Sequence, residues 1–177
     1  LLDWASVAFD AHGLARTGTH PMSEHLLQIC GLTTELETRD GRLRAVDNLD
    51  LTVERGQTVG LVGESGCGKS MLAYSILRLV PQPGRVTAGE VLWKGRDLHR
   101  QSEDELRKVR GREIALIFQE PSAALNPVLT IGDQVAEPLR IHLRLGRNEA
   151  KEKAAELLNA VLIPDPTRRL ADYPHQM

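Results

Sequence analysis

The stretch LVGESGCGKSMLA, Leu61–Ala73, decides how the rest of the chain is interpreted. Within it, Gly63–Ser70 fits the pattern G-x-x-x-x-G-K-[ST] at every position. Glycines in such a loop let the backbone turn, so that successive N–H groups point at one bound anion. A helix that begins near Lys69 adds the partial positive charge of its N-terminus. The pattern therefore predicts a loop that binds the phosphates of a nucleotide.

Two side chains of the loop have specific expected tasks. Lys69 is expected to place a full positive charge against the β- and γ-phosphates, and the Ser70 hydroxyl is expected to bind Mg²⁺. Cys67 is expected to be a passive loop residue. The predicted nucleotide-binding residues are Gly63, Glu64, Ser65, Gly66, Cys67, Gly68, Lys69, Ser70 and Met71.

The segments on either side of the loop suit this mechanism. Thr58–Val62 is a continuous apolar run, which predicts a strand buried on both faces. Lys69–Val80 is predicted to be a helix with Leu72, Ile76 and Leu79 on one stripe, stopped by the prolines at 81 and 83. A strand, a glycine loop and a helix in this order are what a phosphate-binding loop requires.

Strands and helices alternate from Thr58 onward, which predicts an α/β fold with a parallel sheet. The earlier strands, joined by short turns, predict an antiparallel β layer. The expected strands begin near Met22 and cover Leu49–Val53, Val86–Gly95 and Glu113–Phe118. The expected helices are a short one capped by Ser102 and Glu105, one from Thr130 to about Leu143, and one capped by Asn148 with Ala154, Leu157, Leu158, Val161 and Leu162 buried.

The composition is that of an ordinary globular protein. The 177 residues are 41% hydrophobic and carry a formal net charge of −2, so no basic excess points to nucleic acid. No apolar stretch reaches the roughly 18–20 residues of a membrane span. The two cysteines do not predict a disulfide framework, and the six histidines do not have metal-ligand spacing.

Gln119 ends the apolar run of Glu113–Phe118, within the stretch IFQEPSAALNP. A glutamine at the carboxyl end of a parallel strand can reach a ligand beside the glycine loop. Its amide could then bind Mg²⁺ or orient a water molecule. The alternative is that Gln119 is simply a polar residue at the end of a strand.

Four stretches together resemble the ATP-binding subunit of an ABC transporter, of the bacterial type that imports oligopeptides, dipeptides or nickel. They are Ala45–Ser70, Ile114–Pro127, Ile131–Leu139 and Tyr173–Met177. The first is general to ABC ATPases, whereas FQEP…LNP and YPHQ are specific to the peptide branch. The resemblance covers the chain from about Leu26 to Met177. It implies a domain over residues 22–177 with a P-loop NTPase core. A helical subdomain of this domain is expected to start at about residue 128. Residues 1–21 are then expected to be an unstructured N-terminal extension.

The resemblance also implies function. The complete subunit would couple ATP binding and hydrolysis to peptide uptake, with Mg²⁺ held by Ser70 and Gln119 and with Lys69 and Gln119 as catalytic residues. Its partners would be transmembrane permease subunits, a second ATP-binding subunit and, indirectly, a substrate-binding protein, but no nucleic acid. It would lie at the cytoplasmic face of the inner membrane. The transported substrate is left open among dipeptides, oligopeptides, glutathione and nickel.

The sequence departs from the family pattern in two places. The aromatic residue that stacks on adenine aligns with Leu36, and no aromatic residue lies between Met22 and the glycine loop. The Ser-Gly-Gly signature, the Asp-Glu pair and the switch histidine are absent up to Met177, so this chain alone is not expected to hydrolyse ATP. The alternatives are a nucleotide-binding fragment without activity, or a soluble P-loop NTPase of another class.

Overall fold

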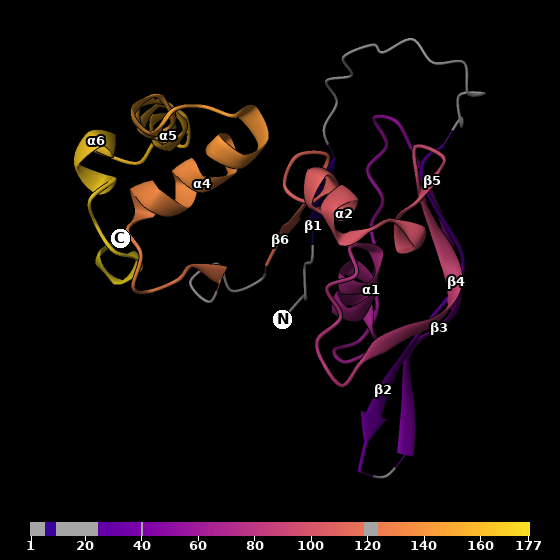
Figure 1. Cartoon of the computed structure of the whole chain (residues 1–177). Helices are drawn as coiled ribbons and strands as arrows, with labels where there is room; N and C mark the ends of the chain where they lie inside the picture. The colour runs from indigo at the N-terminus through magenta and orange to yellow at the C-terminus, as the bar shows by residue number, and fades with distance from the viewer. Residues whose placement is uncertain (1–5, 10–24, 40, 119–123) are drawn as a thin grey trace. The chain divides into compact units, whose positions relative to one another are not determined.

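A computed structural model describes residues 6–9, 25–39, 41–118 and 124–177 (Figure 1). The chain divides into two compact units, Leu1–Leu116 and Ile117–Met177. The helical subdomain expected from about residue 128 lies inside the second unit. Among the residues that the structure describes, no helix is both long enough and apolar enough to cross a membrane.

A four-stranded antiparallel sheet forms most of the first unit. β2 (His25–Thr38) lies between β3 (Gly41–Glu54) and β4 (Arg85–Trp93), and β4 also pairs with the short β5 (Arg96–Asp97). Alternation of apolar and polar residues gives the sheet one buried face. The antiparallel layer predicted from the sequence is therefore confirmed.

The core of the first unit lies between this sheet and two helices. α1 (Lys69–Ile76) contacts β2, β3 and β4 and lies beside their curved ribbon in Figure 1. α2 (Glu103–Val109) follows η1 (Leu98–Arg100) and begins with the predicted capping box of Ser102 and Glu105. The large side chains that are almost fully buried are Leu27, Ile29, Leu32, Val91, Trp93, Leu98, Leu106, Val109 and Ile114.

The prediction of a buried strand at Thr58–Val62 is wrong. The segment has no strand structure, and the Val62 side chain is 88% exposed. The described residues provide it with no neighbouring strand, and an isolated apolar run gains nothing from strand geometry.

β6 (Ile114–Ile117) pairs with β1 (Ser6–Phe9) in a separate two-stranded sheet. β1 therefore gives regular structure to four residues of the stretch expected to be an unstructured extension.

α1 ends at Ile76, four residues before the predicted end at Val80. The N–H of Leu79 donates to the carbonyl of Tyr74, and that of Arg78 donates to Ser75, with Arg78 at φ 52°. These two bonds form a Schellman motif, which closes a helix at a left-handed residue. The helix stops before the prolines are reached, and Leu79, expected on the buried stripe, is instead exposed.

The second unit contains α4 (Ile131–Leu143), α5 (Arg147–Ala160), α6 (Pro166–Arg169) and η2 (Pro174–Gln176). α4 begins at the predicted cap Thr130. Its first N–H groups are bonded within the unit: Ile131 donates to Asp172 and Gly132 to Leu170, at 2.8 and 2.9 Å. The buried cluster between α4 and α5 is small because its buried members are three alanines, Ala136, Ala150 and Ala154.

Two predictions for α5 are wrong. The N-cap is Gly146 rather than Asn148, because the Ala150 N–H already donates to the Gly146 carbonyl. Of the expected stripe only Ala154 and Leu158 are buried, whereas Leu157, Val161 and Leu162 are exposed. A Schellman motif ends the helix at Leu162, whose φ is 62°.

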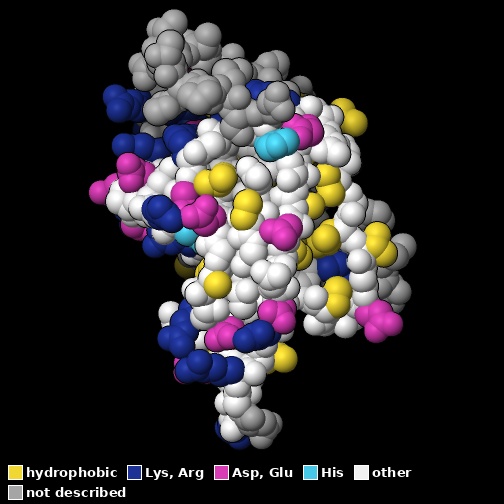
Figure 2. Space-filling model, turned by 90° about the vertical axis from the view of Figure 1, so that its right-hand side faces the viewer, with side chains coloured by type: hydrophobic (Ala, Val, Ile, Leu, Met, Phe, Trp, Pro, Cys, Tyr) yellow, Lys and Arg dark blue, Asp and Glu magenta, His cyan; other side chains and the backbone are white. Residues whose placement is uncertain are grey.

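Charged side chains of both signs are interspersed on the surface. Toward the tip of the β2–β3 hairpin, at the bottom of Figure 2, dark-blue and magenta side chains lie next to one another. Cross-strand ion pairs account for part of this arrangement: Arg44 with Glu35, and Arg85 with Glu37. Surface pairs of this kind contribute little to stability, about 0–1 kcal/mol each.

Candidate nucleotide-binding site

The glycine loop forms the tight turn that its sequence predicts. Ser65 and Gly66 make a turn, and Gly66 and Gly68 have φ of 83° and 94°. α1 begins at Lys69 with Gly68 as its N-cap, so the free N–H groups of the first helical turn adjoin the loop. An anion held by the loop would therefore also meet the positive end of the helix dipole.

The Lys69 ammonium is held inside this loop. Its Nζ donates to the carbonyls of Gly63 and Glu64, at 2.9 and 2.7 Å, and lies 3.5 Å from the Cys67 sulfur. These acceptors carry only partial negative charges. A phosphate in the loop would offer the ammonium a full negative charge, which forms the stronger hydrogen bond.

Space is restricted at two glycines of the loop, and at Gly68 the positive φ also favours glycine. A Cβ at Gly68 would lie 2.0 Å from the Ala45 carbonyl oxygen, and one at Gly63 would lie 2.6 Å from the Cys67 sulfur. The space around Gly66 is open, so its positive φ is the reason for glycine there. The contact with Ala45 shows that β3 supports the loop, which the sequence did not predict.

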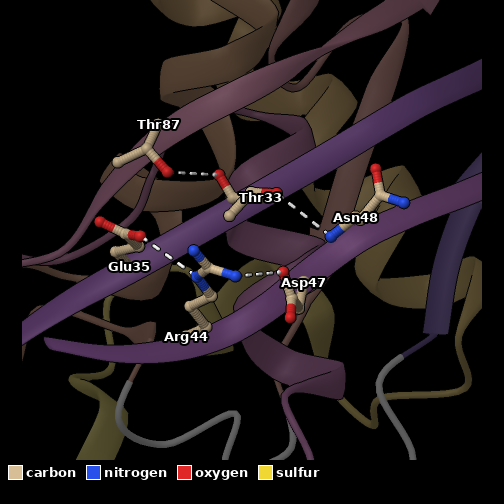
Figure 3. Close-up of polar contacts among 6 residues, drawn as sticks. All are labelled: Thr33, Glu35, Arg44, Asp47, Asn48 and Thr87. Carbon is tan, nitrogen blue, oxygen red and sulfur yellow. Dashed lines mark hydrogen bonds and ion pairs between the residues drawn. The ribbon is translucent and has the colours of Figure 1, made fainter.

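An irregularity in β3 brings the Ala45 carbonyl to the loop. Thr34 pairs with Val46 and Glu35 with Arg44, so Ala45 is an extra residue, as in a β-bulge. The neighbouring side chains hold this irregularity in place. Figure 3 shows Arg44 between Glu35 and Asp47, at 3.4 and 3.2 Å, and the Asn48 N–H donating to the Thr33 hydroxyl at 3.1 Å.

Ser70 and Met71 follow Lys69 in the first turn of α1. Ser70 is exposed, which leaves its hydroxyl accessible to a ligand, whereas Met71 packs against the core. No group of three or more His, Cys, Asp or Glu residues in the described ranges could hold a metal by itself. The Ser70 hydroxyl is therefore the candidate protein ligand for Mg²⁺. One protein oxygen is enough for a Mg²⁺ that is bound mainly through substrate phosphates.

Gln119 and Leu36 were also singled out from the sequence. Gln119 lies outside the described residues. Leu36, at the expected adenine position, pairs with Leu43 across the β2–β3 ladder, and its Cδ2 lies 2.7 Å from where a Cβ at Gly84 would be. Leu36 therefore lies against the loop that follows α1.

A second polar cluster was not predicted from the sequence. Glu113 accepts hydrogen bonds from the Trp93 indole at 2.8 Å, from Lys94 at 3.1 Å and from Arg96 at 3.1 Å. Burial alone would raise the pKa of the Glu113 carboxyl, but these partners outweigh burial and hold the pKa below its usual value. The cluster joins the β4–β5 turn to the start of β6.

Comparison with known proteins places these features in a family. Residues 46–177 match the family described as ABC transporter. A Sinorhizobium fredii (strain NBRC 101917 / NGR234) protein named "Probable peptide ABC transporter ATP-binding protein y4tR" is 47% identical over 163 residues, which are 92% of this chain and 49% of that protein. A Brucella abortus (strain 2308) protein named as a peptide import ATP-binding protein is 47% identical over 152 residues, covering 86% of this chain and 46% of its own. The chain thus spans about half the length of these curated relatives.

Solved structures agree with the sequence relatives. The ATP-binding cassette MJ0796, in a dimeric post-hydrolysis state bound to ADP and Pi, superposes with a TM-score of 0.70 and 25% identity, over 85% of this chain and 62% of that one. A second dimeric structure of the same cassette gives a TM-score of 0.70 at 24% identity. The phosphate-binding loop, the antiparallel layer beside it and these matches lead to one conclusion: the chain belongs to the ABC transporter family.

Proposed function

We propose that this chain binds Mg-ATP through Gly63–Ser70 and acts as part of the ATP-binding subunit of a peptide importer. The observation that carries the proposal is the geometry of the loop, in which two left-handed glycines lead into α1 and the Lys69 ammonium donates to the carbonyls of Gly63 and Glu64. The ADP and Pi of the similar cassette support a nucleotide as the ligand.

The proposed roles of three residues follow from the loop pattern and from the resemblance to the family. Lys69 would hold the β- and γ-phosphates through its positive charge, and the Ser70 hydroxyl would hold the Mg²⁺. Mg²⁺ supplies charge neutralisation on the phosphates when bound. Gln119 is proposed to sense the same metal and the attacking water. The loop by itself provides nucleotide binding. Hydrolysis also needs a Mg²⁺-binding aspartate and a general base, so we propose hydrolysis only for a site that contains them.

The cellular role rests on the names of the relatives, which describe peptide import. The proposed partners are membrane-spanning permease subunits and a second ATP-binding subunit, with a substrate-binding protein acting through the permease. The dimeric state of the similar cassette supports the pairing of two such subunits. The proposed location is the cytoplasmic face of the inner membrane. Uptake of labelled dipeptides, longer peptides and nickel by cells that lack the protein would identify the cargo.

The binding test uses Lys69→Ala with a fluorescent ATP analogue and Mg²⁺. Loss of a charged hydrogen-bond donor costs about 1.5–3 kcal/mol, so affinity should fall roughly 10- to 150-fold. Lys108→Ala, which removes a lysine on α2, is the matched control and should bind normally. Equal affinity of the Lys69→Ala variant and the unchanged protein would contradict the proposal.

A further inference from the structure

Among the residues that the structure describes, one edge of β4 has no strand partner along most of its length. β2 pairs with β4 from Arg85 to Trp93, but on the opposite side β5 pairs only with Leu92 and Trp93. Within the described part of the chain, Arg85–Val91 is thus an open sheet edge. Backbone N–H and C=O groups of alternate residues point outward at such an edge and can pair with another extended chain.

A groove runs along this open edge. Its cavity volume is about 520 Å³, within the range of roughly 300–1,000 Å³ that is usual for ligand sites. Five consecutive residues, 85–89, form one wall. The other lining residues are Arg78, Val80, Gln82, Gly84 and His99. Five consecutive residues of an open strand edge offer an extended peptide a line of backbone groups with which to pair.

The charge of the groove is of one sign. Arg78 and Arg85 line it, and no Asp or Glu is among the described residues that line it. Arg78 is oriented by its left-handed backbone and by a 2.7 Å bond from Nη1 to the Gln101 carbonyl. Arg85 is 3.4 Å from Glu37 in an ion pair with both side chains more than half exposed, so solvent screens that pair. His99 is bonded to the Ser75 carbonyl at 2.8 Å and contributes shape rather than charge.

We propose that this groove binds an extended acidic peptide segment of a partner protein. The segment adds as a strand to the edge of β4, and its carboxylates meet Arg78 and Arg85. Backbone pairing provides affinity in this mode of recognition, and the side chains provide selectivity. Gly89, at φ 91°, interrupts the regular edge, so about four residues, or roughly 13 Å, are available for pairing. The site is separate from the phosphate-binding loop and does not depend on the proposed function.

The test measures fluorescence polarisation of a labelled octapeptide of alternating Glu and Thr against the full chain, with a Lys-Thr octapeptide as the charge-reversed control. The acidic peptide should bind at least about tenfold more tightly. A Glu-Thr peptide N-methylated at alternate backbone nitrogens keeps its charge but loses strand pairing, and should bind at least about tenfold more weakly. Equal binding of the methylated peptide would overturn strand addition.

Protein variants then locate the site. The double variant Arg78→Ala/Arg85→Ala should lose binding at least about tenfold, whereas Arg42→Ala, an exposed arginine of β3 outside the groove, should not. Circular dichroism of each variant verifies folding. Lys69→Ala should bind the peptide normally, which separates this proposal from nucleotide binding. Two results would overturn the proposal. One is a loss of peptide affinity in Arg42→Ala equal to that in the double variant, and the other is binding of phosphatidylserine vesicles but not of the peptide.

Discussion

The glycine loop and the apolar run before it adjoin in the chain but are stabilised differently. Gly63–Ser70 is held by bonds over short sequence distances, such as those from Lys69 to Gly63 and Glu64. Thr58–Val62 has strand composition but no strand structure among the described residues, and Val62 is exposed. A loop closed by its own residues forms from local chemistry, whereas a strand buried on both faces needs partners from elsewhere in the chain.

The largest effect is expected for Gly68→Ala, which tests how far the glycine loop also depends on its contact with β3. Its Cβ would lie 2.0 Å from the Ala45 carbonyl oxygen at a backbone φ of 94°. We expect a loss of about 3 kcal/mol or more in the free energy of unfolding, measured by urea denaturation, and loss of ATP binding. Gly66→Ala, with the same conformational strain but open space, should cost only about 1 kcal/mol. Equal costs for the two variants would refute the close contact with β3.

Glu113→Gln tests an interaction between distant segments. Removing the charge that Trp93, Lys94 and Arg96 share should reduce the free energy of unfolding by about 1–2 kcal/mol at pH 7. The depressed pKa of Glu113 means that its contribution is present above the ordinary carboxyl value of 4.5 and is lost as pH falls through the folded-state pKa. Denaturation from pH 7 to pH 3 should therefore show a smaller decline for the variant. Parallel declines would argue against this role.

Leu162→Gly tests a second locally closed segment, the Schellman motif after α5. Leu162 has φ 62° and is 90% exposed, so its side chain costs conformational strain without gaining burial. Glycine should stabilise the chain by about 0.5–1 kcal/mol, seen as a higher thermal midpoint. Leu162→Ala keeps the strain and serves as the control. If glycine and alanine shift the midpoint alike, strain at this position is not the cause.

The smallest effect is expected at Val62→Lys. An exposed residue outside any element should tolerate the change within about 0.5 kcal/mol. Leu32→Ala, at a fully buried position of β2, should cost about 2–5 kcal/mol in the same urea titration. A large cost at Val62 would show that Thr58–Val62 is buried in solution, and the contrast with the glycine loop would disappear.

Features that a few adjacent residues decide could be predicted from the sequence. The capping box of Ser102 and Glu105, the cap at Thr130 and the turn of the glycine loop all belong to this group. Each depends on hydrogen bonds or backbone conformations within three or four residues. For the same reason, the pattern of glycines, lysine and serine predicts the turn of the loop, while the binding of phosphate by these residues stays a prediction.

The remaining features depend on contacts over long sequence distances or on unusual residue choices. The Schellman motifs use Arg78 and Leu162 where glycine is the usual signal, so neither helix end was visible in the sequence. The Ala45 bulge and the Glu113 cluster join segments that are about 20 residues apart or more. No periodicity of the sequence indicates such pairings. Gln119 stays a prediction.

The burial of Trp93 gives the first unit its own optical probe. Its ring is fully buried, and its indole N–H is bonded to Glu113. Both tryptophans of the sequence precede residue 117, so the second unit contains none. Red-shifted emission on denaturation therefore reports unfolding of the first unit, while far-ultraviolet ellipticity also follows the helices of the second. Comparing the two signals in one titration would show whether the units unfold together or one after the other.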